Sequence, residues 1–501
     1  NLKANYEISD KDRIYVSGYF GRDVLGLSEL FAINWGNATA TLRWNHLVNE
    51  KMFVNTSLVF SDFNYGVDIN FAENASFGLD QAINDIYIKS DWTNFLSQNS
   101  KLNFGGQLIY HRFNPGLFAA NNEESAVVFQ ETQIEKRKAL ESGWYIDHEY
   151  KHSTRLNFRY GLRLSTFSNI GGTEYAYKKD PETAEPISEL TDTTAYGSGE
   201  LYNTYWGMEP RASISYNLST TMALKGSYNR TFQYVQQATN TSSSFPTDQW
   251  FSVNQNIKPQ RADQLAIGLF KNFDIGLETS AEVYYKWLKN QIDYRDNAQL
   301  AFNENLDGEL LVGDGWAYGA EFYVAKTEGS SSGFISYTWA KTMRQINGIS
   351  GDNPYVAGFD RRHNLSAVFT QKFSKRLLGT VSFVFASGQP LTTPVGKYFY
   401  NGEWQTNYND QERNNFRLPA YHRADIGVTL KGKEKPNKRL KSSWNFSIYN
   451  AYNRENPYAL YFREISDTDL EKFPEAQVGN TAALQTTLFK IIPAITWNFE
   501  F

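Results

Sequence analysis

Apolar and polar residues alternate along the last thirteen positions of the chain, 489–501. Because successive side chains of a β-strand point to opposite faces, this pattern predicts a strand with one apolar and one largely polar face. Pro493 lies on the apolar face, where it removes one ladder hydrogen bond unless a bulge or a sheet edge accommodates it. The apolar face carries Phe489, Ile491, Pro493, Ile495, Trp497, Phe499 and Phe501.

The same alternation recurs along the whole chain. Leu156, Phe158 and Tyr160 are predicted to face one side of a strand, and Arg155, Arg159 and Arg163 the other. Further alternating segments lie at 335–339, 380–385 and 444–448. Counting such segments along the sequence predicts roughly 19 strands.

Short and long connections between these segments also alternate. The short ones include 9–11, 151–154, 217–221 and 373–376, and the long ones include 114–138, 168–204, 236–258, 290–315, 343–360 and 387–418. Outer-membrane barrels have short periplasmic turns and long outer loops, whereas a soluble sandwich or propeller has no reason to segregate loop lengths in this way. The pattern therefore predicts a transmembrane, antiparallel, up-and-down β-barrel.

Composition agrees with a barrel, although the mean hydropathy of −0.53 would suit a soluble protein. No apolar run reaches the length of about 18 residues that a transmembrane helix needs. Aromatic residues make up 16% of the 501 positions, and the aromatic girdles of a barrel account for that excess. The absence of cysteine excludes disulfides and thiolate metal sites. The net charge of −5 gives no nucleic-acid footprint.

The direction of the last strand makes a further prediction. If it ends in the periplasm, counting back through roughly 19 strands makes the first strand, 2–8, run inward too. An odd number of strands should then precede Asn1, since bacterial single-chain barrels have even totals, giving about 20 or about 22. The N-terminus is already strand-like and carries no signal peptide, so we expect an N-terminally truncated sequence.

Several motifs, in order along residues 200–501, resemble TonB-dependent outer-membrane receptors of the kind common in Bacteroidota. Among them are Met208-Glu-Pro-Arg-Ala-Ser, Phe359-Asp-Arg-Arg-His-Asn and Arg417-Leu-Pro-Ala-Tyr-His-Arg. Others lie at 224–234, 246–250, 256–264, 447–458 and 488–501. The resemblance implies a barrel of about 22 strands with a plug inside, an energy-coupling segment and active import. Residues 1–501 are then the C-terminal part of a single barrel domain, without the plug and the first strands.

Three arginines, Arg155, Arg159 and Arg163, form a predicted stripe on the lumen face. This stripe could guide an anionic ligand or hold the plug, but an ion-paired wall is the commoner role of such residues. The long loops offer Trp250, Phe251, Tyr398 and Trp404, whose flat faces suit sugars, chelators or peptides. Packing of the loops against one another explains these aromatic residues as well. The arginines of 359–364 are expected to tie a loop to a strand by pairing with loop or lipopolysaccharide anions.

No catalytic, metal-binding or cofactor-binding constellation emerges from the sequence, so an enzyme is not expected. The resemblance makes Trp497, Phe499 and Phe501 the assembly signal of the last strand. It also implies contacts with outer-membrane lipid and lipopolysaccharide, with the TonB complex through the absent N-terminal region, and with a surface lipoprotein.

The leading functional hypothesis is import of a scarce large nutrient, such as a metal chelate, vitamin, peptide or glycan, with energy supplied through TonB. The alternative is a barrel subunit or scaffold of a multiprotein outer-membrane complex. A diffusion porin is a third option, against which the receptor-like motifs argue.

Overall fold

The computed structural model is nearly all β. It describes residues 1–27, 31–72, 75–120, 132–179, 186–238, 249–296, 298, 303–400, 403–408, 411–433, 441–465, 470–471, 474–475, 477 and 479–500. The helical elements among these residues are short 3₁₀ turns, such as η1 (Leu306–Glu309) and η2 (Ser350–Asp352). Within the same ranges, no helix is long and apolar enough to cross a membrane.

One antiparallel sheet forms the wall of a barrel. In the described part of the chain it contains 21 strands, of which β7 (Thr132–Gln133) and β18 (Tyr355–Val356) are two-residue pieces. The other nineteen are β1 (Leu2–Ser9), β2 (Asp12–Leu27), β3 (Phe31–Asn49), β4 (Met52–Ala72), β5 (Ala75–Ser97), β6 (Ser100–Ala120), β8 (Arg137–Lys151), β9 (Leu156–Lys179), β10 (Pro186–Asn217), β11 (Met222–Gln233), β14 (Gln260–Phe273), β15 (Leu277–Tyr294), β16 (Leu310–Lys326), β17 (Ser331–Gln345), β19 (His363–Lys372), β20 (Leu377–Ala386), β25 (Tyr421–Lys431), β26 (Lys441–Tyr449) and β29 (Ile492–Glu500).

Each of these nineteen strands pairs with the next one in the chain, from β1–β2 through to β26–β29. This order confirms the predicted up-and-down barrel, and the strand count agrees with the estimate from alternation. Among the described residues β29 pairs only with β26, and Pro493 lies opposite Ile448 in that ladder.

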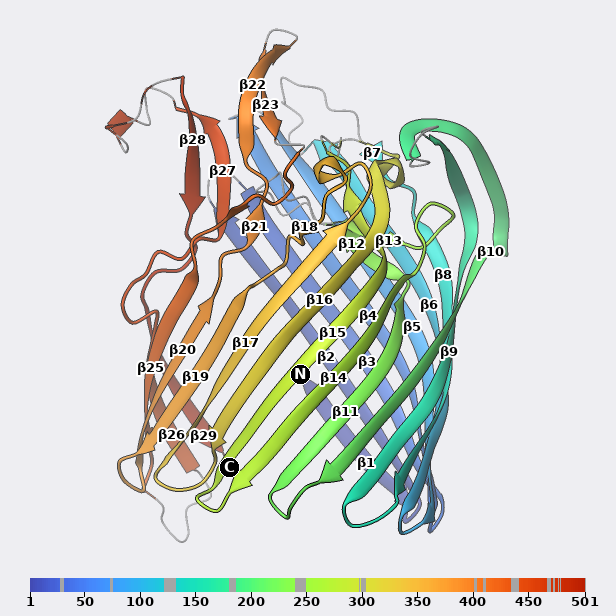
Figure 1. Ribbon diagram of the computed structural model, residues 1–501, viewed down its shortest axis with the longest axis vertical. Helices are drawn as coiled ribbons and strands as arrows, with labels where there is room; N and C mark the ends of the chain where they lie inside the picture. Colours follow the sequence, from blue (N-terminus) through green and yellow to red (C-terminus); the bar gives the residue numbers. More distant parts are fainter. Residues whose placement is uncertain are drawn as a thin grey trace.

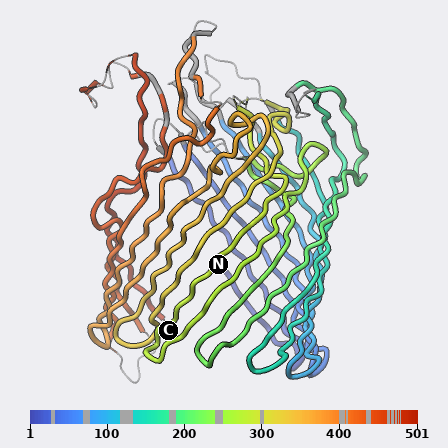
Figure 2. Tube along the Cα trace, viewed as in Figure 1, coloured from blue at the N-terminus to red at the C-terminus, as the bar shows by residue number. Residues whose placement is uncertain are grey.

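The two ends of the barrel differ in their connections. Figure 1 shows the short turns at the lower end and the longer connections at the upper end. The tube in Figure 2 shows the upper connections rising above the wall. The upper end also carries the small strands β12 (Val235–Ala238), β13 (Gln249–Ser252), β21 (Pro390–Leu391), β22 (Pro394–Tyr400), β23 (Glu403–Tyr408), β24 (Phe416–Arg417), β27 (Ala459–Glu464) and β28 (Thr481–Thr486). We call this end the mouth.

The ladder register fixes which side chains face the lumen. Residues directly opposite in an antiparallel pair share a face, so Lys89, Gln107 and Gly143 lie in one row. The row containing Tyr285 and Tyr318 faces the outside, where their rings stack with centroids 6.2 Å apart. Next to it lie Trp287 and Trp339, which complete an aromatic row on the outer surface.

Burial changes along β15 where the wall meets the mouth. From Leu277 to Asn290 the strand alternates between exposed and half-buried residues, but its last four residues, 291–294, are all buried. The change follows a register shift between Leu288 and Gln291, at which Asn290 has a positive φ of 56°. Beyond this point both faces of β15 are covered by other residues. A wall strand that faces a hollow lumen has one face uncovered.

Candidate functional site: the lumen patch and the mouth

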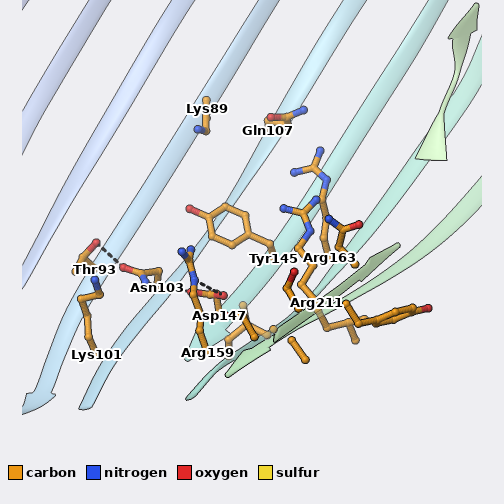
Figure 3. Close-up of a pocket in the computed structure, with 18 residues that line it drawn as sticks. Lys89, Thr93, Lys101, Asn103, Gln107, Tyr145, Asp147, Arg159, Arg163 and Arg211 are labelled. Atoms are coloured by element: carbon orange, nitrogen blue, oxygen red, sulfur yellow. Dashed lines mark hydrogen bonds and ion pairs between the residues drawn. The ribbon is translucent and has the colours of Figure 1, made fainter. Parts of the chain in front are cut away.

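The predicted arginine stripe is split by the structure. Arg159 and Arg163 line a hollow of about 690 Å³ inside the barrel, and Figure 3 shows them beside Arg211 and Tyr145. Arg155 instead lies in the short turn before β9, where its backbone N–H donates to Ser153 Oγ at 3.3 Å. Two of the three arginines therefore belong to one lumen surface, and the third lies at its lower end.

Carboxylates accompany the cations on this surface, which we call the lumen patch. Arg159 Nε lies 2.9 Å from Asp147, and Arg211 lies 3.1 Å and Arg163 3.6 Å from the two oxygens of Glu209. The patch consists of Lys89, Lys101, Arg159, Arg163 and Arg211 with Asp91, Asp147, Glu149 and Glu209. Because the opposite charges nearly balance, this arrangement fits the ion-paired wall better than an electropositive guide for anions.

A hydrophobic core crosses the mouth. Its buried members come from β3, β4 and β5 on one side and from β15 and β16 on the other. Six wall strands separate β5 from β15 along the sheet, so contact between these groups has to span the lumen. This mouth core consists of Ile33, Val67, Leu79, Ile134, Ala238, Phe251, Ile257, Ile292, Tyr294, Leu306 and Leu310.

Phe251, one of the predicted ligand-binding aromatics, is part of this core. It is 5% exposed, and its ring meets that of Tyr294 edge-on with the centroids 6.3 Å apart. Trp250 is half-buried beside a small cavity formed with Phe113, Tyr175 and η1. Loop packing thus accounts for Phe251, while Trp250 keeps an accessible part.

Hydrogen bonds hold residues 249–258, the mouth segment, in place across the lumen. The Val253 N–H donates to the Tyr234 carbonyl at 2.9 Å, and Asn169 donates to the Val253 carbonyl at 2.9 Å. Asn254 donates to Asp307 at 2.6 Å, and Arg137 reaches the same carboxylate oxygen at 2.7 Å. The segment is therefore fixed at once to β9, to Tyr234 between β11 and β12, and to η1.

A second group, the mouth latch, joins three long connections through buried charges. Arg413, between β23 and β24, lies 3.1 Å from Asp293 and 3.0 Å from Asp296 at the top of β15. Asp293 also accepts from Arg344 at 3.1 Å and from the Tyr355 hydroxyl at 3.0 Å. The Arg413 side chain is only 2% exposed, so these bonds carry its charge almost without water.

Burial shifts the titration of the latch. It raises the pKa of Asp296, although the guanidinium of Arg413 opposes the shift. Burial and the nearby Asp293 raise the pKa of the Tyr355 hydroxyl well above its ordinary value. Arg413 stays charged, because Asp293 and its other partners outweigh the desolvation that would lower its pKa.

The raised pKa of Asp296 predicts the behaviour of Asp296→Asn. A carboxyl whose pKa is raised in the folded state stabilises that state as the pH falls through the raised value, because the folded form then binds the proton more tightly. After correction for the intrinsic pH dependence of amide exchange, we expect the mouth of the native protein to open less often as the pH falls from neutral. Asp296→Asn should remove that dependence and change opening at pH 7 by at most about tenfold. Hydrogen exchange of peptides covering 291–296 measures both, and a much larger opening would show that the Arg413 bond outweighs the desolvation.

Sequence reasoning missed the latch. Its partners are separated by 51 residues for Arg344–Asp293 and by 120 for Arg413–Asp293, so no local spacing reveals them. In the structure, the connection that the latch holds contains a run of backbone residues with positive φ: Ser350, Gly351 and Asp352. Such conformations persist only where surrounding contacts impose them.

The motif 359–364 is a tie between a loop and a strand, as predicted. Asp360 accepts from the Thr342 N–H at 2.7 Å and from Arg417 at 2.5 Å, which joins the two receptor-like motifs. Arg362 lies 3.7 Å from the Asp360 carboxylate, which is the predicted pairing with a loop anion, whereas Arg361 donates to the Ser387 carbonyl at 2.9 Å. His363 lies 2.8 Å from the Tyr337 hydroxyl. Among the described residues no group of three His, Cys, Asp or Glu side chains is arranged to hold a metal ion.

The remaining predicted residues lie apart from the mouth core. Tyr398 is 52% exposed on the β22–β23 hairpin, which projects above the mouth in Figure 1. Trp404 is in β23 opposite Phe399, and its side chain lies outside the described residues. Trp497 and Phe499 are exposed on the outer face of β29, where Trp497 stacks on Trp444 with centroids 6.0 Å apart. Phe501 lies outside the described residues.

Comparison with solved structures gives the same architecture at low sequence identity. The ferric preacinetobactin receptor BauA from Acinetobacter baumannii has a TM-score of 0.62 and 10% identity, over 100% of this chain and 71% of that one. The ferric-catecholate import receptor Fiu from E. coli K12 has a TM-score of 0.58 and 12% identity, over 99% and 79%. The ferric yersiniabactin uptake receptor FyuA from Yersinia pestis has a TM-score of 0.61 and 11% identity, over 98% and 69%. At these identities the likeness establishes the fold alone.

A family model assigns the chain to a family, which the distant structures cannot do at such low sequence identity. No curated protein sequence matches the chain closely enough to count as a relative. The model of the TonB dependent receptor-like β-barrel, by contrast, matches residues 3–453, which is most of the chain. The antiparallel up-and-down wall, the short lower turns and the long upper connections are features of outer-membrane barrels. The chain therefore belongs to the TonB-dependent receptor β-barrel family and is an integral protein of the bacterial outer membrane.

Proposed function

We propose that this barrel imports a scarce, large nutrient, with a metal chelate as the first candidate and energy supplied through TonB. The observation that carries the proposal is the packed mouth above a polar lumen. Packed apolar residues and a buried latch cross the outer opening, while ion pairs and hydroxyls line the hollow below. A pore for free diffusion does not need such packing across its opening.

Family membership supports TonB-dependent uptake in general, and three solved relatives of the same fold suggest the substrate class. Their names describe receptors for ferric preacinetobactin, ferric catecholate and ferric yersiniabactin. Since those likenesses rest on about a tenth of the residues, the step to a chelate for this chain belongs to the proposal. The receptor-like motifs favour the branch common in Bacteroidota.

The residues proposed for ligand handling form a path from outside to inside. Tyr398 and Trp404 on the projecting hairpin would meet the ligand first, with Trp250 at the mouth after them. Phe251 would be reached only when the mouth core opens. Arg159 and Arg163 would contact the ligand or the plug in the lumen, and Arg155 would do so last. In this proposal residues 1–501 form one barrel domain. The plug and the energy-coupling segment belong to a part of the receptor outside these residues.

Uptake by cells carrying the full-length gene tests the proposal. A strain without the gene should lose accumulation of a radiolabelled ferric chelate to background, and removal of TonB or addition of a protonophore should have the same effect on the parent strain. Uptake that is indifferent to TonB would indicate a diffusion pore. Unchanged uptake of every tested solute together with a stoichiometric protein partner would favour the scaffold alternative.

A further inference from the structure

Basic residues gather at one side of the lower, periplasmic end of the barrel. They lie in three lower connections: 326–331 between β16 and β17, 372–377 between β19 and β20, and the start of 431–441 between β25 and β26. In Figure 1 these connections are at the lower left, where the yellow to red strands end. We call their six cations the basic sector: Lys326, Lys372, Lys375, Arg376, Lys431 and Lys433. Five of them are exposed, and Arg376 is half-buried.

Hydrogen bonds hold the three connections against one another. The Lys372 N–H donates to the Ser330 carbonyl at 2.7 Å, which joins the first connection to the second. The second is joined to the third because the Lys431 N–H donates to the Arg376 carbonyl at 2.9 Å, and Arg376 Nε donates to the Lys431 carbonyl at 2.8 Å. The basic sector is therefore one continuous surface, although its members come from distant parts of the sequence.

Few carboxylates accompany the basic sector. Glu328 is the only acidic residue in the described part of its three connections, and Lys441, where the third connection ends, is opposite Glu500 and is not counted. The salt bridges of the described residues all lie elsewhere in the barrel. The sequence 434–440 lies outside the described residues, so the sector does not include it.

The rest of the lower end is electrically balanced. Six other short connections of the described wall together carry four basic and four acidic residues. They are 9–12, 49–52, 97–100, 151–156, 217–222 and 273–277. In a chain whose net charge is −5, a strong local excess of positive charge is thus confined to one sector.

This one-sided distribution distinguishes a discrete partner from the general surroundings. Lipid headgroups encircle the barrel, and the cell wall lies beneath its whole lower end. Either would meet all the lower connections alike, so neither accounts for positive charge under β17 to β26 and balanced charge elsewhere. The distribution fits a partner that docks at one side and attracts the basic sector by opposite charge.

The basic sector offers charge without an apolar anchor. Phe373 is the neighbouring apolar residue, and its ring lies over Gly379 on the face of β20 that meets the membrane. Folded protein interfaces are centred on aromatic residues and are poor in lysine, whereas five of the six cations here are lysines. The composition therefore suits a flexible, acidic segment better than the packed surface of a folded domain.

The spacing of the connections suits an extended chain. Neighbouring connections of the sector are two strands apart, which is about 10 Å, so the three together cover about 20 Å. An extended peptide rises about 3.3 Å per residue, and every second side chain is on the same side. A segment of about seven residues with Asp or Glu at alternate positions therefore sets carboxylates against all three connections.

We propose that the basic sector docks an acidic, extended segment of a periplasmic protein. Carboxylates of the segment pair with the ammonium and guanidinium groups of the sector, and long-range attraction between the charges speeds their encounter. The partner is held at one side of the lower end, and the balanced connections stay free. Docking at this surface does not depend on which solute the barrel transports.

Fluorescence anisotropy of the full-length receptor, in nanodiscs of a zwitterionic lipid, tests the site. The probe is a labelled peptide of about seven residues in which glutamate alternates with serine, and its counterpart has glutamine in place of glutamate. We expect only the glutamate peptide to bind, and its affinity to fall at least about tenfold between about 0.05 M and about 0.3 M salt. Lys372→Gln with Lys375→Gln and Lys431→Gln should lower the affinity about tenfold, because three cations are lost.

A matched variant keeps the test specific. Lys11→Gln with Lys51→Gln and Lys151→Gln removes three exposed lysines from the balanced connections and should retain the native affinity. Heat-modifiable migration shows that both triple variants are folded barrels. Absence of binding, equal binding of the glutamine peptide, or equal loss in the two variants would overturn the proposal. So would binding to phosphatidylglycerol vesicles that is tighter than peptide binding and is lost in the sector variant.

Photo-crosslinking in living cells tests for the natural partner. A benzoyl-phenylalanine in place of Thr327, which is exposed in the first connection of the sector, should crosslink to a periplasmic protein at a segment with alternating Asp or Glu. The same residue in place of Thr220, in a connection without charged residues, should not reach that segment. Crosslinks from position 327 to lipid alone, or to neutral or basic peptides, would contradict the proposal.

Discussion

Replacing Arg413 by alanine will open the outer mouth while the barrel wall stays folded. The substitution leaves Asp293, which is 3% exposed, with a buried charge that meets Arg344, the Tyr355 hydroxyl and the Tyr294 N–H but no longer Arg413. Removing one partner of a buried ion pair costs about 3–5 kcal/mol. Amides of 291–296 and 344–356 should therefore exchange at least about a hundredfold faster. Hydrogen exchange with mass spectrometry measures this directly.

Two further arginine variants make the result specific. Arg211→Ala removes a guanidinium that is 51% exposed, so mouth exchange should not change. Arg413→Lys keeps the charge but loses the fork that reaches Asp293 and Asp296 together, and should give an intermediate rate. If Arg413→Ala exchanged at the native rate in both segments, the latch would not be what holds these connections.

Phe251→Asp will release the mouth segment from the lumen. The side chain is 5% exposed inside an apolar core, and a carboxylate placed there without a partner costs several kcal/mol. We expect the amides of Val253 and Ile257, which donate to Tyr234 and Asn254, to lose their protection. Exchange of peptides covering 249–258 gives the measurement, and retention of the heat-modifiable barrel shows that the wall is intact.

Val395→Asp is the matched control for this charge. Val395 is 60% exposed on the β22–β23 hairpin, so a carboxylate there remains in water. Its effect on 249–258 should be negligible. Equal loss of protection in both variants would mean that the mouth core does not hold the segment.

The alternation of apolar and polar residues predicted the wall strands well, because the two environments that cause it act on neighbouring residues of the same strand. In each wall strand one face meets the lumen and the other the membrane, so successive residues record the two environments. For this reason the faces of Arg159 and Arg163, and of Trp497 and Phe499, could be assigned from the sequence alone.

The mouth could not be predicted in the same way. An aromatic residue in a loop looks the same whether it binds a ligand, as was considered for Phe251, or packs in a core, where Phe251 lies. The latch depends on Arg413 meeting Asp293 across 120 residues, and neither residue belongs to a recognisable motif. Only the three-dimensional course of the long connections brings these side chains together.

The sequence separation of the latch partners also bears on the order in which the protein forms. Neighbouring wall strands can pair as hairpins, with little loop entropy lost at each step. Contacts such as Arg413 with Asp293 and Phe251 with Tyr294 join distant connections, and these must first cross the membrane before they can meet. The cover of the mouth is therefore the last part to form, and a receptor can pass through assembly into the membrane with its outer opening still unsealed.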